Sequence, residues 1–202
     1  MKLYFSPYTC SLSPHILLCE TNTPYTLERV DLKTHLTEGG GDYYAINARG
    51  QVPLLVLPNG EQLSEGPIIS QYIVEAAGAT HLLPAQGLPR YRVLEWQNYI
   101  ATELHKSFSP LFNPAYSAEA KQIARGLLRK KYEWLNTVLA QTPYLAGESF
   151  TVADAYLFVV TNWADLVSLD LANLTSVHSY LARIAQRPSV QQAMKAEAAA
   201  AS

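Results

Sequence analysis

The chain has 202 residues, of which 49% are hydrophobic and 16% charged, and its formal net charge at neutral pH is −2. Its length allows one large domain or two modest ones, each able to bury a core. The balanced composition excludes a disordered chain, and the small negative charge argues against nucleic acid as a partner.

Membrane association and disulfide bonding are not expected either. The opening residues MKLYFSPY contain no long apolar segment, and no run approaches the roughly 18 apolar residues that a membrane span needs. We therefore expect a cytoplasmic protein with no membrane partner. The two cysteines, Cys10 and Cys19, are too few for a disulfide framework. Cys19 lies in the helical pattern HILLCE and is interpreted as a buried, inert thiol.

The first part of the chain predicts a small sheet with helices. Strand-length runs occur at KLYF (2–5), TLERV (26–30), LLVL (54–57) and QLSE (62–65). The helical pattern SLSPHILLCE between the first two suits a crossover, which makes those strands parallel. The Asn-Gly pair in PNGE predicts an antiparallel hairpin between the last two strands. A second helix, PIISQYIVEAAG, stops at Gly78.

The second part of the chain predicts helices only. It begins after ATHLLPAQGLP, whose two prolines and glycine are typical of a linker. The expected helices cover residues 88–112, 117–141, 151–168 and 175–186, and a short Ala-rich helical piece starts at 189. The predicted division is a domain of residues 1–78, a linker of residues 79–87 and an all-helical domain of residues 88–202.

Cys10 lies where the first strand gives way to the first helix, in SPYTCSLSPHI. Ser11, Ser13 and Pro14 are residue types that begin helices, so the thiol would face unpaired backbone N–H groups. Those donors and the helix dipole favour a thiolate, which predicts a lowered pKa and a nucleophilic sulfur. The alternative is a small apolar residue that fills space. Without a second cysteine three positions on, an internal dithiol cycle is excluded.

Two short segments could bind an extended peptide ligand. In QVP (51–53) a cis bond before Pro53 would turn the backbone of Val52 outward like a strand edge, although a trans turn is the ordinary expectation. In SEG (64–66), Gly66 allows close approach to a helix N-terminus, which favours a carboxylate. Glu65 could meet an ammonium group beside it, although helix capping alone would also explain this residue.

The helix around LEWQNYIATELHKSFS places an uncharged polar stripe opposite an apolar one. Such stripes are mostly solvated surface. A histidine in this stripe could nevertheless orient a thiol or transfer protons if the stripe faces Cys10. The polar stripe consists of Asn98, Thr102, His105 and Ser109, and the apolar one of Val93, Ile100, Leu104 and Leu111.

Thr151 and Asp154 in FTVADAYLF have the spacing of a capping box that opens a helix apolar nearly all round. We interpret this segment as structural. No phosphate loop, no Cys/His metal spacing and no Ser-His-Asp arrangement stands out in the sequence.

Together, CSLSPHI, GQVPLLVL, LSEGPIISQYI, NYIATELHKSFSPLF and FTVADAYLF resemble the glutathione S-transferase superfamily, specifically its bacterial beta class, over the whole chain. The resemblance implies a thioredoxin-like α/β N-terminal domain of order βαβ-α-ββα with a cis proline at Pro53. It also implies an all-α C-terminal helical domain with the electrophile site, and a symmetric homodimer.

The resemblance also assigns roles to residues. Cys10 would lie against the glutathione sulfur, often as a mixed disulfide, with His105 nearby; both are the expected catalytic residues. Val52 would pair with the cysteinyl backbone of glutathione, and Glu65 and Gly66 would hold its γ-glutamyl end. The remaining expected contacts come from Asn98 and Thr102 on the helix of His105.

One position departs from the family pattern. Relatives often have a lysine after the second strand that meets the glycyl carboxylate, and here that position is His35, in DLKTHLTEGGG. Lys33 is an alternative for the same contact. The hydroxyl residue that activates thiols in other classes has no secure match; the nearby hydroxyl residues are Tyr4, Ser6, Tyr8 and Ser11.

The leading hypothesis is a glutathione transferase that conjugates the glutathione thiol to small hydrophobic electrophiles in detoxification, with glutathione-dependent peroxidase activity as an extension. Glutathione would be a co-substrate, with no tightly bound cofactor and no metal. One alternative is thiol-disulfide exchange through Cys10 by a monothiol route. Another is a non-catalytic carrier of apolar ligands, because fold does not fix function.

Overall fold

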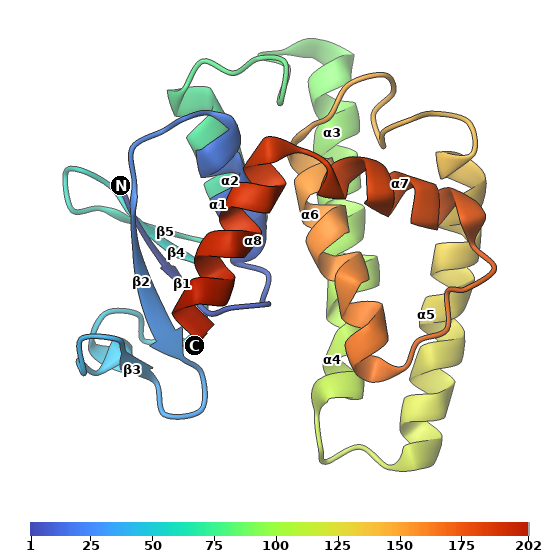
Figure 1. Cartoon of the computed structure of the whole chain (residues 1–202), viewed down its shortest axis with the longest axis horizontal. Coiled ribbons are helices and arrows are strands. Elements are labelled where there is room, and N and C mark those ends of the chain that lie inside the picture. The colour runs from blue at the N-terminus through green and yellow to red at the C-terminus, as the bar shows by residue number, and fades with distance from the viewer. Residues whose placement is uncertain (202) are drawn as a thin grey trace. The chain divides into compact units, whose positions relative to one another are not determined.

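The computed structural model describes residues 1–201 (Figure 1). These residues form two compact units: one contains Met1–Thr80 and the C-terminal stretch from Gln186 on, and the other contains His81–Ala185. Among the helices described here, none has the length and apolar character needed to cross a membrane.

The first unit is built on a five-stranded sheet of order β3-β2-β1-β4-β5. Strand β1 (Lys2–Phe5) is parallel to β2 (Thr26–Asp31) and antiparallel to β4 (Leu54–Val56), which pairs antiparallel with β5 (Gln62–Ser64). The predicted strands, crossover and hairpin are therefore confirmed. Strand β3 (Leu36–Thr37) was not predicted, because two residues are too few to show an alternating pattern.

Three helices accompany this sheet. Helix α1 (Leu12–Glu20) is buried from Leu12 to Cys19, and α2 (Gly66–Ala76) ends before Gly78, whose φ of 64° suits glycine. A single 3₁₀ turn, Tyr43–Ala45, lies in the connector between β3 and β4. Helix α8 (Pro188–Ala201) packs against α1 (Figure 1). The Ala-rich piece expected to be short is thus a helix of 14 residues that completes the first unit.

The second unit is helical, as predicted. Its helices are α3 (Gly87–Tyr99), α4 (Lys106–Phe112), α5 (Ala118–Leu139), α6 (Val152–Thr161) and α7 (Thr175–Ala185), and a 3₁₀ segment, Asn162–Val167, extends α6. The single helix expected over 88–112 contains a π-helical turn, Ile100–His105, between α3 and α4. In this turn the Lys106 N–H donates to the Ala101 carbonyl, five residues back.

Helix α6 is the core of the second unit. Every residue from Val152 to Thr161 is buried, as its apolar pattern predicts. The capping box at its start is present: the Thr151 N–H and hydroxyl each donate to Asp154 Oδ2 at 2.8 Å. The predicted capping box is confirmed.

Candidate functional site

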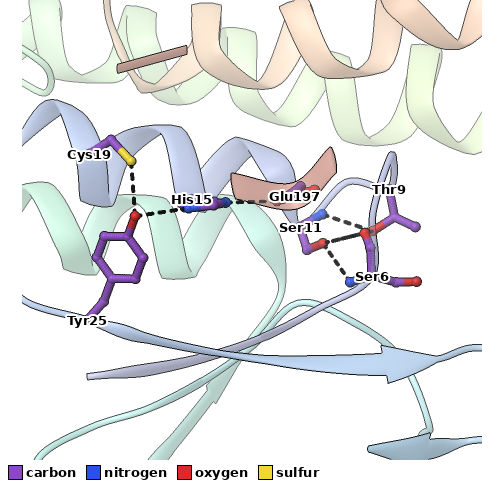
Figure 2. A network of polar contacts seen from close by, with 7 residues as sticks. All are labelled: Ser6, Thr9, Ser11, His15, Cys19, Tyr25 and Glu197. Carbon is purple, nitrogen blue, oxygen red and sulfur yellow. Dashed lines mark hydrogen bonds and ion pairs between the residues drawn. The ribbon is translucent and has the colours of Figure 1, made fainter. Parts of the chain in front are cut away.

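The turn that carries Cys10 is held by a cluster of hydroxyl groups (Figure 2). The Thr9 hydroxyl lies 2.8 Å from both the Ser6 carbonyl and the Ser11 hydroxyl, and the Ser6 N–H donates to Ser11 Oγ at 3.2 Å. Ser11 is fully buried. These short side chains can bond to nearby backbone, which fixes the chain between β1 and α1.

The Cys10 thiol is half-buried and donates to the carbonyl of Val52 at 3.5 Å, next to the cis bond between Val52 and Pro53. Burial raises its pKa to about 12, and the charges of Glu65 and Glu197 act in the same direction. The prediction of a lowered pKa is therefore wrong: backbone N–H donors do favour the thiolate, but burial outweighs them. At neutral pH the sulfur is an S–H donor.

The segment that begins α2 presents Glu65 and Gly66. Glu65 has a φ of 69° and its carboxylate is exposed, where it accepts a hydrogen bond from Arg49 at 2.9 Å. The Arg49 guanidinium also donates to the Ser64 hydroxyl. A Cβ at Gly66 would lie 3.7 Å from the Pro53 ring, so this part of the chain is close to the cis proline. Arg49 was not among the predicted site residues, because it lies in a loop and belongs to no recognisable motif.

His35 is packed in the loop after β2. Its ring lies 4.4 Å from that of Tyr44, centroid to centroid, and its Nδ1 is buried without a hydrogen-bond partner. Gly50 has a φ of 61° and allows this packing, because a Cβ there would be 2.9 Å from His35 Nδ1. Lys33 is exposed, with its N–H on the Asp31 carboxylate at 2.7 Å.

His105 closes the π-helical turn of the second unit. Its Nδ1 lies 2.6 Å from the Tyr156 hydroxyl, and its ring meets that of Trp163 edge to face at 4.8 Å. Asn98 and Thr102 are exposed, and the Thr102 hydroxyl donates to the Asn98 carbonyl at 3.1 Å. The opposite stripe, Val93, Ile100, Leu104 and Leu111, is buried as predicted. Tyr156 and Trp163 were missed, because their helix was interpreted as purely structural.

A buried polar network joins α1 to α8 in the first unit (Figure 2). His15 Nδ1 lies 2.9 Å from a Glu197 carboxylate oxygen, His15 Nε2 lies 3.0 Å from the Tyr25 hydroxyl, and that hydroxyl lies 3.2 Å from Cys19 Sγ. Cys19 is buried, as predicted. The pairing of His15 with Glu197 could not be predicted from the sequence, because 182 residues separate the two side chains.

The electrostatics of this network favour a charged pair. Burial alone would lower the pKa of His15, but its contacts with Cys19 and Glu197 outweigh burial and raise that pKa to about 9. Burial raises the pKa of Glu197, and the hydrogen bond and charge of His15 oppose that shift. Within residues 1–201, no group of three or more His, Cys, Asp or Glu side chains is arranged to hold a metal ion.

Comparison with known proteins identifies the family. Residues 5–76 match the glutathione S-transferase N-terminal domain and residues 99–188 match the glutathione S-transferase C-terminal domain. The chain belongs to the glutathione S-transferase family. It is 45% identical over 198 residues to glutathione S-transferase GstA of Escherichia coli O157:H7, and the match covers 98% of each chain. Glutathione S-transferase GST-4.5 of Xanthomonas campestris is 36% identical, again with 98% of each covered.

Solved glutathione S-transferases show the same fold. The bacterial enzyme BphK, in a ternary complex, has a TM-score of 0.95 at 45% identity, with 98% of this chain and 100% of that chain covered. The bacterial beta-class enzyme of Sphingomonas chungbukensis has a TM-score of 0.94 at 41% identity, with 98% of both covered. This glutathione S-transferase therefore has the thioredoxin-like and helical parts that its sequence predicts, and it resembles the beta class.

Proposed function

We propose that this glutathione S-transferase conjugates the thiol of glutathione to small hydrophobic electrophiles in detoxification, and that it reduces organic peroxides with glutathione. The observation that carries the proposal is the Cys10 thiol. It is kept protonated, it lies 3.5 Å from the Val52 carbonyl, and it stands in the unit that matches the N-terminal domain of the family. An S–H at this position can donate to a glutathione thiolate and stabilise it.

The glutathione site is proposed within residues 1–78. Val52 would pair with the cysteinyl backbone, and Glu65 and Gly66 would receive the γ-glutamyl head. Arg49 supports this placement, because its guanidinium beside the Glu65 carboxylate can meet the carboxylate of the same head group. His35, whose Nδ1 lacks a partner, would receive the glycyl carboxylate, with Lys33 as the alternative.

The electrophile site is proposed within the helical unit, residues 88–185. His105, Asn98 and Thr102 are proposed to contact glutathione from this unit. A glutathione complex of a sphingomonad relative, 43% identical, supports glutathione as co-substrate. We further propose a homodimer in the cytoplasm.

The proposed step is a nucleophilic substitution. Glutathione loses its thiol proton to solvent, its sulfur forms a bond to the electrophilic carbon, and a halide leaves with the electrons of the broken bond. Because the thiolate is the reactive form, the main task of the protein is to lower the pKa of the glutathione thiol. Cys10 contributes a hydrogen bond and is not consumed.

Steady-state conjugation of glutathione to a chloronitrobenzene tests the proposal. Cys10→Ser keeps a donor and should stay within a few-fold of wild-type kcat/KM, whereas Cys10→Ala should lose roughly tenfold or more. Cys19→Ala is the matched control, because that thiol is buried and lies 3.2 Å from the Tyr25 hydroxyl in the network of His15. An absence of glutathione-dependent turnover with both a chloronitrobenzene and an organic peroxide would overturn the proposal.

The raised pKa of Cys10 disfavours thiol-disulfide exchange, because the attacking species is the thiolate. Protein mass after incubation with glutathione disulfide separates the two functions. A rapid, reductant-sensitive adduct on Cys10 would favour exchange, and no adduct alongside turnover would favour conjugation. A carrier function would show as tight apolar-ligand binding while glutathione leaves Tm unchanged.

A further inference from the structure

A lysine of α5 contacts the π-helical turn Ile100–His105. The Lys131 ammonium donates to the Glu103 carbonyl and to the Glu103 carboxylate, at 2.8 Å each, and to the Ser107 hydroxyl at 3.1 Å. The Ser107 hydroxyl donates to the same Glu103 carbonyl at 2.6 Å. An ammonium has three donors, so this lysine can direct all of them at one segment of the neighbouring helix.

The Glu103 carbonyl is the important acceptor, because it belongs to the backbone of the turn. A π-helical turn bonds five residues back, as the Lys106 N–H does to Ala101, and is wider than an α-helix. A carbonyl oxygen has two lone pairs, so the ammonium and the Ser107 hydroxyl can satisfy it without an α-helical N–H. Side chains that enter the backbone ladder can hold a helix out of its regular geometry. Lys131 thus supplies a donor from α5 that stabilises the wider turn.

The π-helical turn also changes the direction of the side chains that follow it. An α-helix turns by about 100° per residue, so one extra residue in a turn rotates the next side chains by about that angle. Ordinary helical periodicity predicts Asn98, Thr102 and His105 on one polar stripe. In the structure Asn98 and Thr102 are exposed, whereas the His105 ring packs against that of Trp163, with the ring centroids 4.8 Å apart. The turn therefore sets the direction of His105 relative to the other two residues.

We propose that Lys131 is a positioning residue for glutathione binding, because it holds the π-helical turn that sets the direction of His105. This role rests on the proposed function, in which His105, Asn98 and Thr102 contact glutathione. The Glu103 carboxylate is nearly half exposed, so its ion pair with Lys131 contributes little. A charged donor makes a hydrogen bond about twice as strong as a neutral one, and here it acts on the backbone itself. The contact with the carbonyl is therefore the one that positions the turn.

Nuclear Overhauser contacts between the rings of His105 and Trp163 test this role in ligand-free protein. Lys131→Met removes the three donors and keeps the apolar stem of the side chain. Without the ammonium the turn should relax toward an α-helix and rotate His105, so the ring contacts should weaken relative to wild type. His105→Asn identifies the His105 signals among the five histidines. Contacts of wild-type strength in Lys131→Met would overturn the proposal.

Two variants are matched controls. Glu103→Gln removes the carboxylate but keeps the carbonyl, so Lys131 retains its backbone acceptor. Lys130→Met removes a neighbouring, exposed lysine of α5. Both variants should keep the contacts between His105 and Trp163. If either control weakened them as much as Lys131→Met, the ion pair or the overall charge of α5 would be responsible, and the proposal would fail.

Kinetics show whether the position of the turn matters for glutathione. Lys131→Met should raise KM for glutathione about tenfold, as expected when one hydrogen bond to a charged ligand is misaligned, while KM for a chloronitrobenzene stays within about twofold. Glu103→Gln and Lys130→Met should keep both values. A parallel rise of both KM values in Lys131→Met would indicate general loosening of the helical unit and would contradict the positioning role.

The two measurements separate this role from the proposed function. The ring contacts are measured without glutathione, so they decide whether Lys131 holds the turn even if no turnover is found and the proposed function fails. Weakened ring contacts with an unchanged KM for glutathione would overturn the positioning role and leave conjugation standing.

Discussion

Asp154 and Glu197 are two buried carboxylates, one in each unit, and they are held in different ways. Within residues 1–201, the hydrogen bonds that the Asp154 carboxylate accepts come from neutral groups, whereas Glu197 is paired with the imidazole of His15. Asp154 serves a helix start three residues away, and Glu197 joins α8 to a helix near the other end of the chain. The neutral donors of Asp154 are the Leu145 and Thr151 N–H groups and the hydroxyls of Thr151 and Tyr180.

The difference separates two kinds of stabilisation. Neutral donors keep their protons across the physiological pH range, so the Asp154 cap is indifferent to alkali. The Glu197 pair depends on a proton on His15, so the contact between α1 and α8 weakens when that proton is lost. The capping box of Asp154 and the ion pair between Glu197 and His15 therefore give the two units different responses to pH.

The largest expected effect comes from Asp154→Ala, which removes the carboxylate that is held by neutral donors. It leaves four buried donor groups without their acceptor, so the free energy of unfolding should fall by roughly 3–5 kcal/mol. Urea unfolding measures this change. Asp165→Ala removes an exposed carboxylate of the same unit and should change little. A loss below about 1 kcal/mol for Asp154→Ala would mean that other groups replace the acceptor.

The next effect is alkaline loss of stability through His15. Because folding raises its pKa from 6.5 to about 9, the stabilisation is complete below the lower value and is lost as pH rises through the upper one. The free energy of unfolding should fall by an amount on the order of 3 kcal/mol between about pH 6.5 and pH 9.5. Urea unfolding at a series of pH values checks this slope.

Glu197→Gln should flatten the pH dependence, because the charged partner of His15 is gone. Glu20→Gln is the matched control: it removes a carboxylate at the end of α1 that pairs with Arg187, the residue before α8, and arginine keeps its charge at these pH values. The slope should therefore persist in Glu20→Gln. An equal slope in Glu197→Gln and wild type would assign the pH response to another group.

A smaller effect is expected at the far end of the Glu197 network. Tyr25→Phe removes the hydroxyl that bridges His15 Nε2 and Cys19 Sγ, which should cost about 1 kcal/mol by urea unfolding. The alkaline slope should remain, since the carboxylate is still present. A flattened slope would show that Tyr25, rather than Glu197, holds the proton on His15.

The smallest effect should come from Glu103→Gln, a carboxylate that is nearly half exposed beside Lys131. The Lys131 ammonium lowers the pKa of Glu103, but exposed pairs contribute little. Tm should stay close to that of wild type, and any small difference should vanish in high salt. A large fall in Tm that persists in high salt would mean that the Glu103–Lys131 pair stabilises the protein as a buried ion pair does.

Much of the fold could be predicted, because its signals are local. Strand β1 is a compact apolar run, β2 contains the alternating segment TLERV, the Asn-Gly pair specifies the hairpin, and the capping box at Thr151 specifies the start of α6. The π-helical turn could not be predicted, since its sequence keeps ordinary helical periodicity. The place of α8 against α1 could not either, because only the folded chain brings His15 and Glu197 together.

The electrostatics of the candidate site could not be predicted from the sequence. The position of Cys10 before a helix correctly suggests backbone donors near the sulfur. Its pKa depends on burial and on the Glu197 charge from the other end of the chain, which a local motif does not contain. Arg49 and Tyr156 escaped notice for the same reason, because each acts on a residue distant in sequence.

The packing of α8 on α1 sets an order of events during synthesis. When Met1–Thr80 has emerged from the ribosome, the helix that completes its unit is still more than a hundred residues away. At about 5–20 residues per second, roughly 5–20 s pass before Glu197 can meet His15. The helical unit can fold while the first unit waits, so residues made after the helical unit complete the unit that was begun before it.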